Sequence, residues 1–178
     1  MRIIGGKFKG RTLAEFKGDD VRPTSDRAKE ALFNILAFRL VGARVLDLFA
    51  GSGALGLESL SRGAKEVVFN DYSKNSLSIL QKNLTALKIG EEAKVKNLDY
   101  AACLGQVSGQ FDLIFIDPPY KQEYGEKALK MIAERGLLTK DGIAVYERDV
   151  PFSIEVEGLE KFDERKYGRA YLAFFKRK

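Results

Sequence analysis

The sequence predicts an α/β fold with a mostly parallel sheet that is covered by helices on both faces. Strand-like apolar segments alternate regularly with helical stretches from Arg44 onward. One of these segments, Phe111–Ile116, is apolar and flanked by polar residues, as a buried parallel strand should be. A glycine-rich segment, Gly51–Gly56, stands between the first predicted strand and the next helix. With 178 residues, the chain is long enough for one such domain.

The N-terminal residues precede this alternation and are predicted to form a short β-hairpin, because Gly5 and Gly6 separate two short apolar runs. Pro23 ends the hairpin, and a helix follows from Asp26, with apolar residues at helical spacing after Ala28. We therefore expect residues 1–22 to be a basic hairpin appendage and residues 23–178 to be the main domain.

The alternation predicts the remaining elements in order. Strands are expected at Val45–Ala50, Glu66–Asn70, Lys94–Leu98, Phe111–Ile116 and Ile143–Glu147. Helices are expected at Ala54–Arg62, Ser73–Leu87, Tyr100–Val107 and Glu123–Arg135. The last two strand-like segments are expected to form an antiparallel pair, Ser153–Val156 with Ala170–Phe175.

The composition excludes several kinds of site. The chain has no histidine, which excludes Ser-His and Cys-His nucleophile systems and the usual Cys/His zinc sites, so no metal is expected. Its single cysteine, Cys103, excludes an intramolecular disulfide and favours the cytoplasm. No apolar run approaches the roughly 18 residues that span a bilayer, and the first residues lack a signal-peptide core.

Positive charge is concentrated near the N-terminus. Residues 1–44 carry 10 Lys and Arg against 5 Asp and Glu, whereas residues 45–178 carry 20 against 20. The segment Arg165–Lys178 adds 6 basic residues and no acidic ones. This distribution indicates a polyanionic partner, although charge alone is equally compatible with a solvated basic face.

Gly51, Gly53 and Gly56 match the G-x-G-x-x-G pattern between a strand and a helix, which indicates a site for an adenosine-containing cofactor. Asp71 lies 20 residues after Gly51 and can accept hydrogen bonds from ribose hydroxyls, which NAD and S-adenosylmethionine share. Asp47 favours S-adenosylmethionine, because its charge would repel a pyrophosphate and attract an ammonium or sulfonium group. The alternative for Asp47 is a structural carboxylate that caps local amides.

Asp99 follows the third predicted strand and supplies a further candidate contact. Its carboxylate can accept from an adenine amino group, while Leu98 or Tyr100 packs on the ring. A cap of the next helix is an equally good interpretation of Asp99.

The segment Asp117-Pro118-Pro119-Tyr120 ends a buried strand with two prolines, which cannot continue a strand ladder. The Asp117 carboxylate and the Pro118 carbonyl can accept the two hydrogens of a planar amine, and the Tyr120 ring can stack on its base. The amine nitrogen would then point its lone pair at the methyl donor, and Asp117 or water would take the proton. The alternative interpretation is a simple turn.

Four segments together resemble the RsmD-type bacterial methyltransferases: Val45–Ala64, Asp117–Tyr120, Arg22–Leu36 and Arg2–Arg11. The resemblance extends to about Glu147. It implies a Rossmann-like, class I S-adenosylmethionine-dependent methyltransferase fold. It also implies methyl transfer from S-adenosylmethionine to the N2 amine of a guanine in 16S ribosomal RNA, free or in a small-subunit assembly intermediate, by a monomer.

The resemblance also implies roles for individual residues. The cofactor-binding residues would be Asp47, Phe49, Gly51, Ser52, Gly53, Asp71, Tyr72, Leu98 and Asp99. The target base would be held by Asp117, Pro118, Pro119 and Tyr120. RNA would be bound by Lys7, Lys9, Arg11, Arg22, Thr24 and Arg27. The sequence departs from the family at Asp71, where glutamate is usual, so the side chain is one methylene shorter.

Three other functions are also compatible with the sequence. The Asp-Pro-Pro-Tyr segment also fits a DNA amino-methyltransferase that acts on adenine N6. Against this function, we see no separate target-recognition region in the 178 residues. The glycine pattern also fits an NAD-dependent oxidoreductase, against which Asp47 argues. A non-catalytic RNA-binding module could keep the same fold as a scaffold.

Overall fold

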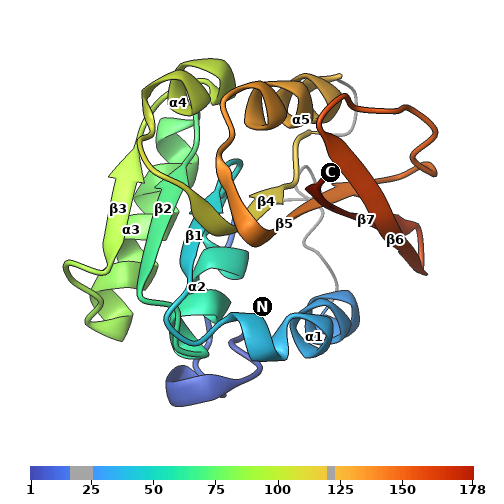
Figure 1. The fold of residues 1–178 in the computed structure, drawn as a ribbon. Coiled ribbons are helices and arrows are strands. Elements are labelled where there is room, and N and C mark those ends of the chain that lie inside the picture. The colour runs from blue at the N-terminus through green and yellow to red at the C-terminus, as the bar shows by residue number, and fades with distance from the viewer. Residues whose placement is uncertain (17–25, 120–122) are drawn as a thin grey trace.

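The computed structural model describes residues 1–16, 26–119 and 123–178, which include a seven-stranded sheet (Figure 1). Its strands are β1 (Arg44–Asp47), β2 (Glu66–Asn70), β3 (Ala93–Lys96), β4 (Phe111–Ile116), β5 (Leu138–Arg148), β6 (Leu159–Tyr167) and β7 (Ala170–Arg177). The helices are α1 (Asp26–Ile35), α2 (Ala54–Ser61), α3 (Lys74–Leu87), α4 (Tyr100–Gln106) and α5 (Tyr124–Glu134), with short 3₁₀ helices η1 (Gly6–Phe8) and η2 (Ala37–Arg39).

The strand order β3-β2-β1-β4-β5-β7-β6 confirms the predicted fold class. Strands β1 to β5 are parallel, β7 runs antiparallel to β5, and β6 runs antiparallel to β7. The direction in which the chain adds strands reverses between β1 and β4. Strands β2 and β3 lie on one side of β1, and β4 and all later strands lie on the other. In open α/β sheets, ligands bind beyond the carboxyl ends of the strands at such a reversal.

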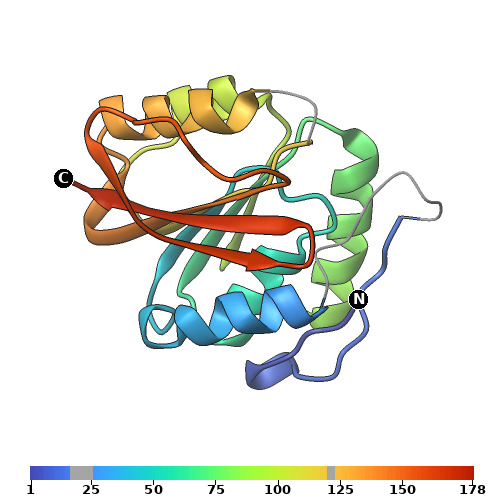
Figure 2. The same ribbon diagram turned by 90° about the vertical axis from the view of Figure 1, so that its right-hand side faces the viewer.

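Helices cover both faces of the sheet. Apolar side chains of α1, α2 and α3 pack on one face, for example Phe33, Leu57 and Leu80. The opposite face is covered by α4 and α5, with Leu104 and Leu129 fully buried (Figures 1 and 2). Each such side chain contributes roughly 1.5–3 kcal/mol when it is removed from water. No helix in the described residues is long and apolar enough to cross a membrane.

The C-terminal pair differs from the prediction. Ser153–Val156 is not a strand, and the partner of β7 is β6, Leu159–Tyr167. The reason is that β6 is an edge strand with mostly exposed charged side chains, a common protection against unwanted pairing that hides the apolar alternation. Residues 153–156 belong instead to the connection between β5 and β6, in which Val156 packs into the core.

The N-terminal segment, defined here as residues 1–16, pairs with itself in antiparallel fashion through a single bridge between Arg2 and Thr12. The turn of this segment contains η1, Gly6–Phe8. Ile3 and Leu13 are buried in the core formed with α1 and α2. The segment therefore packs on the sheet domain along much of its length.

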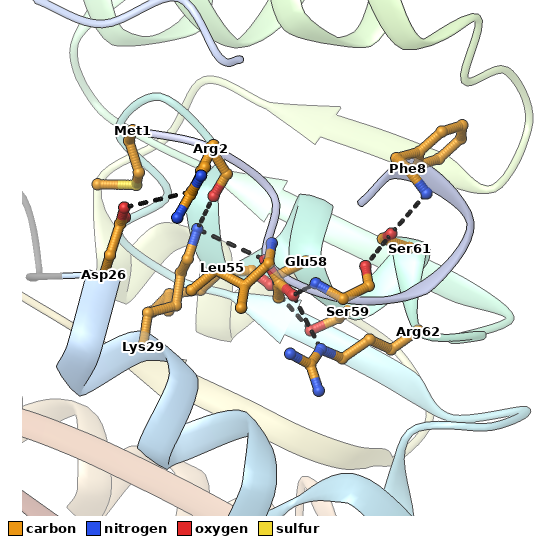
Figure 3. Close-up of polar contacts among 12 residues, drawn as sticks. Met1, Arg2, Phe8, Asp26, Lys29, Leu55, Glu58, Ser59, Ser61 and Arg62 are labelled. Atoms are coloured by element: carbon orange, nitrogen blue, oxygen red, sulfur yellow. Dashed lines mark hydrogen bonds and ion pairs between the residues drawn. The ribbon is translucent and has the colours of Figure 1, made fainter. Parts of the chain in front are cut away.

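A buried carboxylate fixes the start of this segment (Figure 3). Glu58, which is fully buried on α2, accepts hydrogen bonds from the backbone N–H groups of Ile4 (2.9 Å) and Gly5 (2.8 Å). The Arg62 guanidinium, one turn further along α2, pairs with the same carboxylate at 2.8 Å. Glu58 thus satisfies backbone donors that no strand partner reaches.

Lys29 of α1 completes this cluster. Its fully buried ammonium lies 3.5 Å from Glu58 and donates a hydrogen bond of 2.6 Å to the Arg2 carbonyl (Figure 3). Burial lowers the pKa of Lys29, although the charge of Glu58 opposes this effect. The cluster joins α1, α2 and the N-terminal segment through polar contacts inside the protein.

Candidate active site

The predicted cofactor and amine motifs meet at one edge of the sheet. β1 ends at Asp47, and its register aligns Asp47 with Phe69 of β2 and with Phe115 of β4. Asp71 and Asp117 follow the ends of those two neighbouring strands. Asp47, Asp71 and Asp117 therefore lie at the edge of the sheet formed by the carboxyl ends of the parallel strands, where the strand order reverses.

The glycine loop, residues Leu48–Gly53, connects β1 to α2 and needs left-handed backbone at two glycines, with φ of 55° at Gly51 and 86° at Gly53. A Cβ at Gly51 would meet nothing within 4 Å, so this glycine leaves the main chain open to a ligand. A Cβ at Gly53 would lie 2.4 Å from Leu80, and one at Gly56 would lie 2.2 Å from the Phe69 ring. Those two glycines permit close packing within the protein.

Asp47 is 2% exposed and accepts a hydrogen bond from the Gly56 N–H at 3.0 Å. Burial raises its pKa to about 7, while the bond from Gly56 opposes this shift. The capping of a local amide, which was the alternative interpretation of Asp47, is therefore present. A contact with the cofactor stays a prediction.

Asp71 also holds the glycine loop. One carboxylate oxygen accepts from the Gly51 N–H and the other from the Ser73 N–H, both at 2.8 Å. The neighbouring Tyr72 side chain is 79% exposed, which leaves its ring free to cover a ligand. A contact of Asp71 with ribose stays a prediction, and its carboxylate lies beside the open glycine, Gly51.

Asp99 caps α4, because its carboxylate accepts from the N–H groups of Ala101 (2.9 Å) and Ala102 (3.0 Å). The capping interpretation is thus confirmed, and a contact with adenine stays a prediction. The carbonyl of Leu98 accepts a hydrogen bond of 3.0 Å from the side chain of Asn70, which also donates to Leu48. Asn70 therefore ties the ends of three strands together.

Three aromatic rings gather beside these loops. Phe49 of the glycine loop lies 5.8 Å from Tyr100 and 6.5 Å from Tyr124, measured between ring centroids, and its plane is within 6° of the Tyr124 plane. Tyr100 and Tyr124 are 5.0 Å apart. The sequence did not reveal the location of Tyr124, because a single tyrosine at the start of a helix carries no periodic signal. The rings form an apolar wall suited to a planar ligand.

Asp117 directly follows β4, and its pKa is raised well above the usual value. The first cause is burial, and the negative charges of Glu147 and Asp47 add to it. Pro118 is buried and Pro119 is exposed, while Tyr120 lies outside the described residues. A carboxylate with a raised pKa at a ligand-binding edge is typical of a functional group.

Glu147 of β5 is a further candidate residue, one that the sequence patterns did not single out. It is 5% exposed, and the register that pairs Ile116 with Tyr146 places it next to Asp117. Glu147 is a charged residue at the end of the predicted apolar strand Ile143–Glu147, and this was the signal that could have identified it. The described residues contain no group of three His, Cys, Asp or Glu side chains that could hold a metal ion.

The predicted RNA-binding residues lie away from the glycine loop. Lys7 and Lys9 are exposed beside η1, where the Phe8 N–H donates to Ser61 at the far end of α2. An eight-residue helix is about 12 Å long, so the lysines and the glycine loop are separated by roughly that length. Arg11 donates to the Ala86 carbonyl of α3 at 2.9 Å.

The other predicted RNA-binding residues are Arg22, Thr24 and Arg27. Arg27 is exposed on the first turn of α1. Arg22 and Thr24 lie outside the described residues.

Comparison with known proteins gives the family. The family model described as conserved hypothetical protein 95 matches residues 1–176. The chain belongs to this family, the RsmD-type methyltransferases. Membership confirms the resemblance inferred from the glycine-rich, Asp-Pro-Pro-Tyr and N-terminal segments.

Relatives of this RsmD-type chain are similar over most of its length. The Bacillus subtilis (strain 168) protein YlbH is 36% identical over 183 residues, with 100% of each chain covered. Ribosomal RNA small subunit methyltransferase D of Escherichia coli (strain K12) is 39% identical over 150 residues, which cover 84% of this chain and 75% of that protein. The solved structure of Escherichia coli yhhF has a TM-score of 0.89 and 35% identity, covering 100% of this chain and 98% of that one. The RsmD-type chain therefore has the Rossmann-like methyltransferase fold that the sequence predicts.

Proposed function

We propose that this chain transfers a methyl group from S-adenosylmethionine to the exocyclic N2 amine of a guanine in 16S ribosomal RNA. One observation carries the proposal: Asp117 follows β4 directly beside the glycine loop that follows β1, where the strand order reverses. A methyl donor on the loop and an amine on Asp117 would therefore be neighbours. Membership of the RsmD family supports the coarser part of this proposal, methyl transfer to ribosomal RNA.

The residues at the loop fit S-adenosylmethionine better than a dinucleotide. Asp47 ends β1, Asp71 follows β2 and Asp99 follows β3, and no ion pair in the described residues supplies any of them with a cation. A pyrophosphate would be repelled there, whereas an ammonium or a sulfonium would be attracted. The bound cofactor supplies a methyl group on a positively charged sulfur. The open side of Gly51 allows its methionine part to approach the main chain.

The target base would be held at the end of β4. The Asp117 carboxylate and the Pro118 carbonyl accept the two amine hydrogens and so direct the nitrogen lone pair toward the donor. Methyl transfer releases one proton, which passes to Asp117 or to water. Because burial and nearby carboxylates raise the pKa of Asp117, it is a better proton acceptor than an ordinary aspartate. The rate should therefore fall as the pH falls through that raised pKa.

The basic residues of the N-terminal segment and α1 would bind the RNA backbone. Lys7 and Lys9 lie roughly a helix length from the glycine loop, so a substrate that contacts both must extend over several nucleotides. This separation favours ribosomal RNA, free or in a small-subunit assembly intermediate, over a mononucleotide. We expect the protein to act as a monomer in the cytoplasm, where this RNA is assembled.

The direct test is incubation with labelled S-adenosylmethionine and small ribosomal subunits that lack the methyl group. Mass spectrometry of the digested RNA should then locate the label on N2 of one guanine. Label on adenine alone, or activity on duplex DNA but not on ribosomal RNA, would contradict the proposal. A thermal-shift comparison separates the cofactors: S-adenosylhomocysteine should stabilise the protein, and NADH should not.

A further inference from the structure

A buried side-chain amide connects the N-terminal segment to the glycine loop. Asn83 of α3 is 2% exposed, and its side-chain oxygen accepts from the Ala14 N–H at 2.7 Å. Its side-chain nitrogen donates to the Ala14 carbonyl at 3.1 Å and to the Ser52 carbonyl at 2.9 Å. One amide thus bonds both backbone groups of Ala14 and a carbonyl of the cofactor loop.

The position of Asn83 is fixed by the core. Leu80 and Leu84, on either side of it along α3, are buried among the apolar residues beneath the sheet. Leu80 also lies against Gly53, where a Cβ would approach it to 2.4 Å. Both Asn83 and Leu80 therefore hold the glycine loop against α3, and Asn83 alone of the two also reaches Ala14.

The three bonds of Asn83 depend on one another. A buried amide that loses a partner exposes an unsatisfied donor or acceptor, at a cost of about 1–3 kcal/mol. Ser52 and Ala14 must both stay in place for the amide to remain fully bonded. A ligand that fixes Ser52 therefore also restricts Ala14, and the converse holds.

We propose that Asn83 is a positioning residue that makes cofactor binding and RNA binding strengthen each other. The inference rests on the proposed function, since it takes the glycine loop as the cofactor site and the N-terminal segment as part of the RNA site. Fixing the loop with cofactor reduces the conformational entropy that the segment loses when RNA binds. Linkage then requires RNA to raise cofactor affinity by the same factor.

The test measures the binding of an unmodified 16S rRNA transcript with and without saturating S-adenosylhomocysteine. In the wild type, S-adenosylhomocysteine should raise RNA affinity about fivefold or more, the lower end of typical coupling between sites. In Asn83→Ala, this factor should fall below about twofold. Ala14→Pro removes the N–H that donates to Asn83, keeps the Ala14 carbonyl, and also fixes the local backbone; it should reduce the factor in the same way.

One control variant and one further readout separate this role from a general structural one. Gln110 likewise donates its side-chain amide to two backbone carbonyls, those of Gly136 (3.0 Å) and Leu138 (3.1 Å), at the amino edge of the sheet. Gln110→Ala should keep the coupling factor; because Gln110 is exposed, its loss of stability should be smaller than that of Asn83→Ala. Hydrogen exchange supplies a readout without RNA: S-adenosylhomocysteine should slow exchange of the Ala14 amide in the wild type but not in Asn83→Ala.

Each outcome decides a different question. A folded Asn83→Ala protein with the wild-type coupling factor would overturn the inference, as would a wild type that binds both ligands without coupling. A wild type that binds neither S-adenosylhomocysteine nor the transcript would overturn the proposed function itself. Equal loss of coupling in Gln110→Ala would assign the effect to general destabilisation and refute the role of Asn83.

Discussion

Carboxylates lie beneath the N-terminal segment and at the carboxyl ends of the central strands, but their surroundings differ. Glu58, beneath the N-terminal segment, is paired with the cations of Lys29 and Arg62. At the strand ends, no ion pair in the described part of the chain reaches Asp47 or Asp117, and burial raises the pKa of both. A carboxylate with its cation is a stable anchor. A buried carboxylate without one can still accept a cation or a proton from a ligand.

The largest effect is expected at Asp117, the carboxylate proposed to hold the amine. Asp117→Ala should lower methyl transfer by about 10⁴-fold, because it removes an acceptor of the amine hydrogens, while S-adenosylhomocysteine binding is kept. Single-turnover assays and calorimetry measure the two effects. Asp112→Asn, which changes a carboxylate at the opposite end of β4, is the control and should remain active. Full turnover in Asp117→Ala would show that Asp117 is not needed to hold the amine, and would contradict its proposed role.

The contribution of the paired carboxylate Glu58 to stability is tested by its replacement. Glu58→Ala should lower the free energy of unfolding by about 3–5 kcal/mol, because it leaves Lys29 buried without its carboxylate. Urea denaturation measures the change. Glu160→Ala removes an exposed partner of Lys176 and should cost at most about 1 kcal/mol. Similar losses in both variants would show that the buried cluster is no stronger than a surface pair.

The raised pKa of Asp47, which has no cation partner among the described ion pairs, is tested by the pH dependence of the free energy of unfolding. Between about pH 4 and 7 the unfolded chain loses the Asp47 proton and the folded chain keeps it, so the free energy of unfolding falls as pH rises. The contribution is at most about 4 kcal/mol, since each pKa unit corresponds to about 1.4 kcal/mol. Thermal unfolding of Asp47→Asn should therefore show a flatter pH profile than the wild type. Asp149→Asn, at an exposed position, should follow the wild-type profile.

The smallest effect concerns the exposed cations of the N-terminal segment. Replacement of Lys7, Lys9 and Arg11 by glutamine should make the slope of log affinity for single-stranded RNA against log salt less steep by about 2, since each lost phosphate contact contributes roughly 0.7. Lys94, Lys130 and Lys140, which are exposed on other elements, supply a control with the same change in charge. An equal effect of both triple variants would contradict a localised RNA site.

Much of the fold was accessible from local patterns. Phe111–Ile116 has the predicted bounds, and the helices after Gly53 and Ser73 end within one residue of the predicted positions. Apolar periodicity and cap residues act over a few positions, so they can be read without the tertiary structure. The edge strand β6 carries no such local pattern, because its side chains are mainly charged and exposed.

Patterns along the chain were enough to predict the alternation of strands and helices, the glycine-rich segment Gly51–Gly56 and the carboxylates near the strand ends. Only the folded chain shows that Glu147 adjoins Asp117, that Glu58 holds the N-terminal segment, and that Asn83 joins Ala14 to Ser52. The physical reason is range: periodicity reflects neighbours along one element, whereas a buried polar side chain finds its partners across elements. Asn83 and Ala14 are 69 positions apart in the chain, and no local pattern connects them.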